Sequence, residues 1–368
     1  MKFPERWSKL NVALGHDWLT GMRGGERVLE IFCAGFPQAP IYTLLHVPRS
    51  VSAIINAHAI HTSWLQHIPG IVRTYRHFLP LFPAAIKAFR LAPADLLIST
   101  SHCVAKGLRP PPGTKHLCYC FTPMRYAWCF QREYFQGRPV ARLFSRPVLA
   151  ALRRWDRVSC KRVHHFVAIS RHVQQRIRKF YNRDADVVYP PVDTHKWTPS
   201  ANEHIDFDLV VSALVPYKRI DLAVRAYNRL GFPLKIVGTG TETQRLQSLA
   251  GPNIQFCGWQ PDEVLLHLYR NCRLLVFPGE EDFGIVPLEA QACGKPVVAY
   301  AAGGALETVR DGLTGVLFHE QTEEALIAAV ERCSKIIWDM ELLTEHARQF
   351  NVQRFIDGLA AIIDKLLP

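Results

Sequence analysis

The stretch FPGEEDFGIVPLEAQACGKPVVAY, residues 277–300, decides how this chain is interpreted. It starts at the end of an apolar run, passes through a loop with three acids and two glycines, continues as a helix-like pattern and ends in a second apolar run at 296–300. Short runs that are apolar throughout and alternate with helices are typical of parallel sheets that helices cover on both faces. We therefore predict a strand, a helix and a second strand of an α/β protein here.

The same alternation extends over the whole chain. Twelve apolar runs are predicted to be strands: residues 10–16, 40–45, 95–101, 116–121, 164–170, 186–190, 208–214, 234–240, 253–258, 273–278, 296–300 and 314–318. Residues 190–207 are rich in proline and polar residues and have no clear period, so we expect a domain boundary there. The predicted fold class is α/β, with two Rossmann-like, doubly wound parallel-sheet domains, residues 1–192 and 193–368, that face each other across a cleft. The amphipathic segment 351–367 is expected to pack on the protein, and the N-terminal domain is one surface that could receive it.

The composition is that of a globular protein. Of the 368 residues 48% are apolar and 21% charged, and no stretch approaches the roughly 18 uninterrupted apolar residues of a membrane-spanning helix. The N-terminus, MKFPERWSKLNVALGHDW, carries charges where a signal peptide has its apolar core, so we expect a cytoplasmic protein. The ten cysteines have no zinc or redox spacing, and we interpret Cys118 and Cys120 as facing opposite sides of a strand. Reduced thiols are therefore expected.

The net charge of +12 calls for an anionic partner. Residues 142–183 are especially basic and contain the single acid Asp156. Three of their cations repeat every four residues and are predicted to share one helix face: Arg153, Arg157 and Lys161. Three apolar residues are predicted on another face: Val148, Leu152 and Trp155. This pattern fits either a solvated helix face or a surface for anionic lipid headgroups. Nucleic acid is not expected as a partner, because no helix-turn-helix, RNA-binding or zinc-finger signature accompanies the charge.

Glycines and cations follow several of the predicted strands, at the edge where open α/β sheets bind ligands. Gly24 and Gly25 precede a helix and could let phosphate oxygens reach the backbone amides, without the spacing of a dinucleotide site or a P-loop. Lys218 and Arg219 stand at a helix start and suit a diphosphate, although a surface pair is equally possible. Gly238 marks another place where a nucleotide could approach the backbone.

The opening stretch can now be interpreted as a binding loop. The amides of residues 283–286, Phe283, Gly284, Ile285 and Val286, are expected to point at a ligand above the helix start. Glu281 in the loop and Glu289 in the helix can each bind vicinal hydroxyls, on either side of a diphosphate. Sugar, diphosphate and ribose together make a nucleotide sugar. The alternative is that Glu289 only complements the helix dipole and that Glu281 is solvated.

These motifs together resemble the retaining glycosyltransferases of family 4, which have the GT-B architecture of two Rossmann-like domains. The resemblance covers nearly the whole chain. In the first half it rests on HDWLTGMRGGERVLE (16–30), STSHCVAKG (99–107) and CYCFTPMRYAW (118–128). In the second half it rests on SALVPYKRIDLAVRAYNRLG (212–231), on EEDFGIVPLEAQACGKPVVAYAAGGALETVRDGLTG (280–315) and on the spacing of the two glutamates. These sequence motifs look like those of the family branch that includes O-antigen and exopolysaccharide mannosyltransferases.

The resemblance implies roles for the residues at the matching positions. Glu289 would bind the ribose hydroxyls, and Glu281 would act at the transferred sugar near its reacting face. Lys218 would hold the diphosphate, together with the amides of residues 283–286 and with Gly24 and Gly25.

Two positions depart from the commoner family pattern. Many relatives have arginine where Ala213 stands, and Arg219 is a candidate to supply that charge. Histidine is common where Phe121 stands, so the sugar contacts there fall to other residues. His102 and Arg125 are the nearby candidates.

The implied activity is transfer of a sugar, with retention at the anomeric carbon, from a nucleotide-sugar donor to a glycan or lipid-diphosphate-linked acceptor at an anionic membrane surface. GDP-mannose is the favoured donor, and no metal or other cofactor is expected, the triplet Asp184-Ala-Asp186 included. One alternative is a nucleotide-sugar 2-epimerase on the same architecture. Another is a non-catalytic sugar-nucleotide binding partner, which the residues at 213 and 121 make conceivable.

Overall fold

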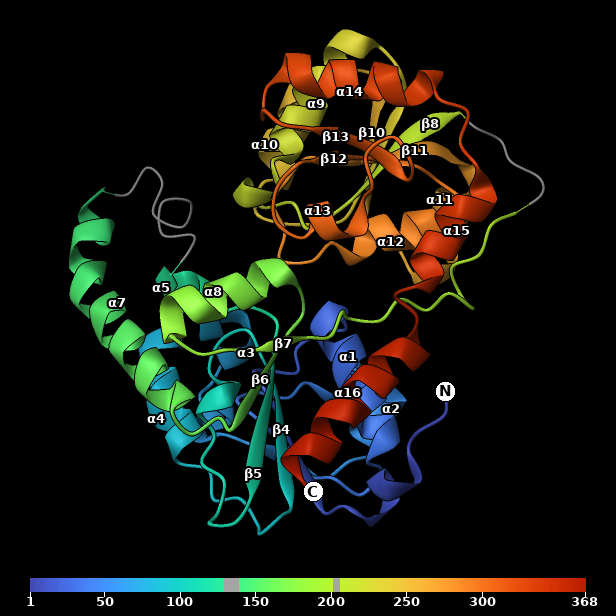
Figure 1. The fold of residues 1–368 in the computed structure, drawn as a ribbon. Helices are drawn as coiled ribbons and strands as arrows, with labels where there is room; N and C mark the ends of the chain where they lie inside the picture. The colour runs from blue at the N-terminus through green and yellow to red at the C-terminus, as the bar shows by residue number, and fades with distance from the viewer. Residues whose placement is uncertain (129–138, 201–205) are drawn as a thin grey trace. The chain divides into compact units, whose positions relative to one another are not determined.

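The computed structural model describes residues 1–128, 139–200 and 206–368. Two units can be separated along the chain, and each is described by itself (Figure 1). The first unit contains Met1–Tyr189 and Ile356–Pro368, and the second contains Pro190–Phe355. The last helix, α16 (Val352–Leu366), therefore starts in the second unit and continues in the first.

The first unit is built on a parallel sheet in the order β3-β2-β1-β4-β5-β6-β7. Its strands are β1 Val12–His16, β2 Ile41–Thr43, β3 Ile60–Thr62, β4 Leu96–Ser101, β5 Lys115–Cys120, β6 His165–Ala168 and β7 Asp186–Val187. Its α-helices besides α16 are α1 Gly24–Gly35, α2 Ala53–Asn56, α3 Ile71–Thr74, α4 Phe82–Lys87, α5 Arg125–Trp128, α7 Pro139–Cys160 and α8 Arg171–Tyr181. Every residue of β1 and β4 is buried, as expected for strands covered on both faces.

The second unit repeats this design in the order β10-β9-β8-β11-β12-β13. Its strands are β8 Phe207–Val211, β9 Leu234–Val237, β10 Ile254–Gly258, β11 Cys272–Phe277, β12 Val297–Tyr300 and β13 Gly315–Phe318. Its α-helices are α9 Ile220–Leu230, α10 Thr243–Leu249, α11 Asp262–Asn271, α12 Ile285–Ala292, α13 Ala305–Thr308, α14 Glu323–Lys335 and α15 Met340–Arg348. Helices α9 and α14 lie on one side of this sheet, and α11, α12 and α15 lie on the other (Figure 1).

Both sheets confirm the predicted α/β fold class with Rossmann-like, doubly wound parallel sheets. All twelve predicted strands are present, although most are shorter than the apolar runs. The prediction missed β3, whose three residues are only partly buried or exposed at the edge of the first sheet. A short edge strand has no apolar run from which it could be recognised.

The interpretation of Cys118 and Cys120 as facing opposite sides of a strand is wrong. Residues two apart on a strand share a face. Burial, together with a hydrogen bond to Cys118, raises the pKa of Cys120 well above its ordinary value. Nine cysteines within the described ranges are free thiols, and Cys129 lies outside those ranges.

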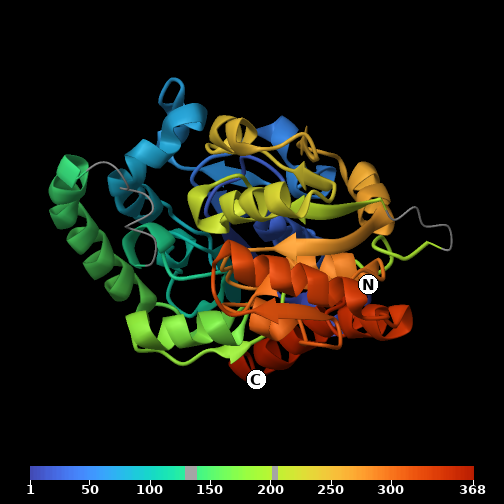
Figure 2. The ribbon, with the colours of Figure 1, turned by 90° about the horizontal axis from the view of Figure 1, so that it is seen from above.

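The predicted basic helix is α7, which runs along the outside of the first unit (Figures 1 and 2). Leu152 is buried and Trp155 half-buried, but the placement of Val148 is wrong, because this side chain is 39% exposed. Lys161 lies one residue past the helix, and the side chain of Arg142 lies outside the described residues. No helix in the described parts of the chain is both long enough and apolar enough to cross a membrane.

A buried ion pair explains how α7 is oriented. Asp156 of α7 is fully buried and lies 2.6 Å from Nζ of the buried Lys106. The indole N–H of Trp128 and the hydroxyl of Tyr181 both donate to Oδ2 of Asp156 at 2.8 Å. A charged residue thus belongs to the buried side of the helix, which a pattern of apolar residues alone could not indicate.

Candidate functional site

The loops that follow β8 and β11 meet at the carboxyl edge of the second sheet. The sheet order reverses between these two neighbouring strands, and open α/β sheets bind ligands at such a point. The two loops touch through their backbones, because a Cβ atom at Gly279 would lie 2.7 Å from the carbonyl oxygen of Lys218. A side chain at position 279 would therefore force the loops apart.

Lys218 and Glu281 form an ion pair across these two loops. The ammonium group also lies 5.3 Å from the ring centroid of Tyr217. The backbone of Glu281 is fixed from the other side, because its carbonyl oxygen accepts the N–H of Gly304 at 2.8 Å. A side chain at Gly303 would overlap that same carbonyl oxygen. The structure thus brings together two of the residues predicted to bind the diphosphate and the sugar.

Glu289 lies in the second turn of α12 and is almost completely buried. One of its carboxylate oxygens, Oε2, accepts a hydrogen bond from the hydroxyl of Tyr269 at 2.9 Å. Burial and the neighbouring charge of Glu289 raise the pKa of Tyr269 well above its ordinary value, so this hydroxyl remains a donor. The carboxylate is therefore oriented by its own protein before any ligand binds.

The N-terminus of α12 has the geometry of an anion site. Gly284 precedes the helix with φ 97° and ψ 65°, a conformation that favours glycine. Phe283 is buried, whereas Ile285 and Val286 are half-buried. The first N–H groups of any helix have no partner within the helix, and the helix dipole adds partial positive charge there. A phosphate group could accept these N–H groups.

Arg219 has a different environment from Lys218. It has a left-handed backbone, φ 53°, and its guanidinium lies 3.3 Å from Oδ1 of Asp221 and 3.1 Å from Oε1 of Gln321. Gln321 in turn donates to the carbonyl oxygen of Pro278 at 2.9 Å. The side chain of Arg219 therefore connects the loops around the site.

Gly238 makes a close backbone contact with the protein itself. Its φ is 131°, and a side chain there would overlap the carbonyl oxygen of Ser212 after β8. Its N–H donates to Gly258 at 2.7 Å. The residue that follows Gly258, Trp259, is 73% exposed. Sequence reasoning missed this exposed aromatic residue, whose ring offers a surface on which a base could stack.

In the first unit the predicted residues gather beyond β1, β4 and β5. Gly25 lies in the first turn of α1, and a Cβ atom there would be 3.3 Å from the ring of Phe121. The His102 ring centroid lies 6.5 Å from that of Phe121. Gly24 is exposed, with no atom within 4 Å of a Cβ placed on it, and Arg125 opens α5 and is half-buried.

Asp17 is a residue of this region that sequence reasoning missed. It is fully buried directly after β1, and its carboxylate lies 3.0 Å from Nδ1 of His102. An acid that follows a buried strand at the expected ligand edge was the available signal.

The described residues contain no group of three or more side chains that could hold a metal ion. Asp186, of the triplet mentioned above, lies 2.9 Å from Nε2 of His165.

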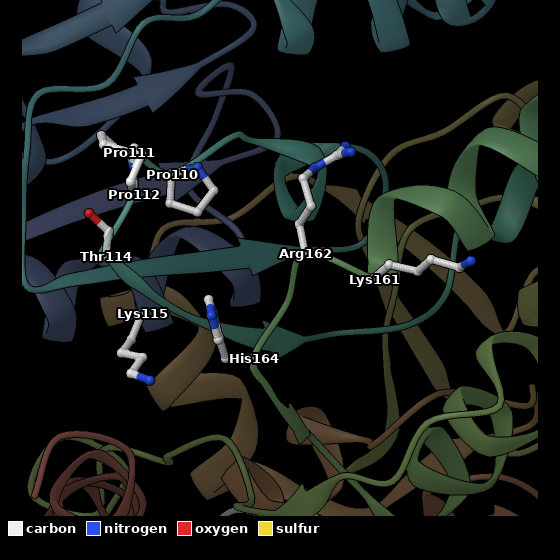
Figure 3. A pocket seen from close by; sticks show the side chains of 9 residues that line it. Pro110, Pro111, Pro112, Thr114, Lys115, Lys161, Arg162 and His164 are labelled. Atoms are coloured by element: carbon white, nitrogen blue, oxygen red, sulfur yellow. The ribbon is translucent and has the colours of Figure 1, made fainter.

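The pocket shown in Figure 3 lies elsewhere, at the amino ends of β5 and β6. It has a volume of about 430 Å³ and is lined by residues 110–115, 161, 162 and 164. Lys115 and Lys161 point in different directions, so its cations do not converge on one ligand (Figure 3). It contains none of the predicted site residues.

Comparisons with known proteins show which families and folds the chain resembles. Residues 193–349 match the family described as "Glycosyl transferases group 1". An uncharacterized glycosyltransferase of Methanocaldococcus jannaschii is 26% identical over 54% of this chain and 59% of its own. A D-inositol 3-phosphate glycosyltransferase of Acidothermus cellulolyticus is 33% identical over 42% of this chain and 40% of its own. The chain thus spans about half the length of these relatives.

A solved structure extends the likeness to nearly the whole chain. Anabaena Alr3699/HepE in complex with UDP and glucose matches with a TM-score of 0.70, over 96% of this chain and 99% of that one. The two are 17% identical, so this likeness shows the fold alone. Residues 193–349 thus match the glycosyl transferases group 1 family, and the chain has two Rossmann-like parallel sheets in a fold like that of Alr3699/HepE.

Proposed function

We propose that the protein is a retaining glycosyltransferase of family 4 that moves a sugar from a nucleotide-sugar donor to a glycan or lipid-linked acceptor in surface polysaccharide synthesis. The observation that carries this proposal is the ion pair of Lys218 and Glu281 beside the N-terminus of α12. It brings a cation and a hydroxyl acceptor close to the N-terminal N–H groups of a helix, at the edge where open α/β sheets bind ligands.

The parts of a nucleotide sugar can be assigned to these groups. The diphosphate would accept the N–H groups of residues 283–286 and the charge of Lys218. Glu289 would accept the ribose hydroxyls, and its hydrogen bond to Tyr269 leaves acceptor capacity on the carboxylate. Glu281 would accept hydroxyls of the transferred sugar. The neighbouring structure of Alr3699/HepE, which contains UDP and glucose, supports a nucleotide-sugar donor.

The residues of this site would mainly stabilise charge. When the bond between sugar and diphosphate breaks, negative charge grows on the diphosphate. In this assignment Lys218 and the N-terminus of α12 would lie where that charge develops, and such preorganised groups would lower the barrier. The departing diphosphate would take the proton of the acceptor hydroxyl. We propose no metal and no other cofactor.

Mannose is the favoured sugar and GDP the favoured nucleotide, because of the motifs shared with the mannosyltransferase branch. The named relatives include D-inositol 3-phosphate glycosyltransferases, so inositol phosphates belong among the acceptors to be tested.

The test is a screen of GDP-mannose, UDP-glucose and other nucleotide sugars by thermal shift, followed by transfer of labelled sugar. A donor at about 100 times its Kd should stabilise the second unit by about 2.7 kcal/mol. Transfer of the labelled sugar that occurs only when an acceptor is present supports the transferase. Turnover of a donor to its 2-epimer without acceptor, or binding without any turnover, contradicts it.

The first unit would meet an anionic membrane surface at the cytoplasmic side. Residues 1–189 contain 28 lysines and arginines against nine acids, whereas residues 190–368 contain 16 against 23. Such a separation of charge is typical of proteins with one anionic partner. Lipid-diphosphate acceptors would lie at the same surface, where each cation contributes about 1 kcal/mol.

Not every cation of α7 is available for that surface. Arg153 donates to the carbonyl oxygen of Ala127 at 2.8 Å, and Arg157 donates to that of Phe180 at 3.1 Å. Both guanidinium groups lie over the ring of Trp128, at 5.6 and 4.9 Å from its centroid. The cations with exposed side chains that would meet lipid include Arg146, Arg154 and Lys161.

A further inference from the structure

Asp17 is surrounded by the loop that follows β4. Its two carboxylate oxygens accept the backbone N–H groups of residues 102–105 at 2.6–2.9 Å. Burial alone would raise the pKa of this carboxyl group. The charge and hydrogen bond of His102, the charge of His16 and the N–H of Ala105 outweigh burial and hold the pKa well below its ordinary value. Asp17 is therefore a charged acceptor in neutral solution.

This acceptor fixes the ring of His102. Nδ1 of His102 lies 3.0 Å from Oδ2 of Asp17. An ionised carboxylate can only accept hydrogen bonds, so Nδ1 of His102 carries a proton in both states of the ring. In the neutral form that is the only proton, and Nε2 then carries a free lone pair. The ring of Trp18 meets that of His102 edge-on, with 4.6 Å between centroids, and limits its rotation.

The other ring nitrogen is available to a ligand. Within residues 1–128, 139–200 and 206–368, Nε2 of His102 has no hydrogen-bond partner. The side chain is 31% exposed, whereas Asp17 beneath it is fully buried. Both residues lie where β1 and β4 adjoin, at the point where the order of the first sheet reverses. Phe121 and the start of α1 border the same edge.

We propose that Asp17 is a positioning residue that holds His102 so that Nε2 accepts a hydrogen bond from a hydroxyl group of the carbohydrate substrate. This inference rests on the proposed transferase function. A hydroxyl bound to a fixed lone pair has a fixed direction, which orients the sugar that carries it. Sugar hydroxyls can donate in this way, whereas an ionised phosphate cannot.

Two substitutions separate the two ring nitrogens. His102→Asn can still donate an amide N–H to Asp17, but it is too short to reach the position of Nε2. His102→Gln can place its amide oxygen near Nε2 and loses the bond of Nδ1. We expect His102→Asn to lower kcat/KM for transfer about tenfold, the loss of one hydrogen bond, and His102→Gln to recover part of that loss.

The chain offers a matched control. His165 at the amino end of β6 forms a similar pair with Asp186, at 2.9 Å and with 34% of its side chain exposed. His165→Asn should leave transfer unchanged. If His102→Asn transfers sugar as fast as the wild type, the proposal is overturned, whatever the stability of Asp17→Asn. Asp17 would then only anchor the loop that follows β4.

NMR of the full chain with ¹⁵N-labelled histidine rings tests the positioning directly. The His102 signals are those missing in His102→Gln. We expect the proton on Nδ1 in the wild type and a share of the other tautomer in Asp17→Asn. A proton on Nε2 in the wild type overturns the proposal. If the wild type transfers no sugar from any donor, the proposed function fails, and the NMR result alone then decides the geometry of the pair.

Discussion

The ammonium group of Lys218 is held by the carboxylate of Glu281, although the two residues follow different strands, β8 and β11. In the proposed function they act on different parts of the donor, the diphosphate and the sugar. A bound diphosphate would therefore compete with Glu281 for the same cation. The binding of donors and that of free nucleotides should respond differently when this pair is changed.

Glu289→Gln should weaken binding of free nucleoside diphosphate by about 1.5–3 kcal/mol, because a hydrogen bond to a charged group is lost at the ribose. Glu281→Gln should bind the free nucleotide at least as tightly as the wild type, since it releases Lys218 from its counter-charge. Both substitutions should greatly lower the rate of sugar transfer while leaving the fold intact. Isothermal titration and circular dichroism provide the measurements, and equal nucleotide affinity in all three proteins would refute the assignment.

Lys218→Ala should lose more transfer activity than Arg219→Gly. Glycine is the matched choice at 219 because it accepts the left-handed backbone there. Arg219 is bonded to Asp221 and Gln321, so its removal should mainly lower thermal stability. Steady-state kinetics and melting curves separate the two effects. A greater loss of transfer in Arg219→Gly would show that this arginine binds the diphosphate.

Gly279→Ala should disrupt the contact between the two loops of the site. The new Cβ atom would lie 2.7 Å from the carbonyl oxygen of Lys218, and overpacking of this kind costs about 1–3 kcal/mol. We expect weaker donor binding together with lower stability. Gly21→Ala is the control, since no atom lies within 4 Å of a Cβ there. Unchanged donor binding in Gly279→Ala would show that the loops adapt.

Charge reversal on the exposed cations of the α7 region should release the protein from anionic vesicles. The triple variant replaces Arg146, Arg154 and Lys161 with glutamate and spares the arginines packed on Trp128. Binding of the wild type should fall steeply with salt, because the attraction is screened within about 8–10 Å. A triple reversal at exposed cations of the second unit, Arg310, Lys335 and Arg348, serves as control. If the two triple variants sediment equally with anionic vesicles, the proposed binding of the α7 region to a membrane surface is wrong.

Acid should destabilise the first unit through His116. Burial, followed by the charges of His164 and Arg162, lowers the pKa of this histidine to about 3. The unfolded chain binds the proton at an ordinary pKa of about 6.5, so stability falls as the pH drops from about 6.5 toward 3, by up to about 1.4 kcal/mol per pH unit. His116→Gln should show a shallower slope in urea unfolding over this range. Parallel slopes would mean that His116 is protonated in the folded protein.

The fold was predictable because its strands are apolar on both faces. Runs such as PVVAY at 296–300 have no alternation of apolar and polar residues, which is typical of a parallel sheet between helices. The prediction missed the edge strand β3 because this strand lacks such an apolar run. The orientation of α7 was predicted only in part, because a buried ion pair, Lys106 with Asp156, lies beside the apolar contacts on its inner face.

Residues of the candidate site were predictable where they lie in the segments that follow a strand. Glu281 and Lys218 stand in such loops, so the sheet topology brings them together. Sequence spacing could not show that Arg219 turns toward Asp221 and Gln321, since Gln321 is far along the chain. The contact between Asp17 and residues 102–105 was equally hidden, because it joins two loops through backbone N–H groups that every sequence has.

The carboxylate of Asp17 acts as a built-in anion. Four N–H groups that converge on one point form a nest of the kind that elsewhere receives phosphate, and in the first unit this nest is already filled by the protein's own side chain. At the corresponding edge of the second unit the start of α12 follows a glycine with positive φ instead. Two sheets of the same design are thereby made unequal: at this edge of the first unit the protein's own carboxylate takes the position that, in the proposed function, a phosphate would take in the second unit.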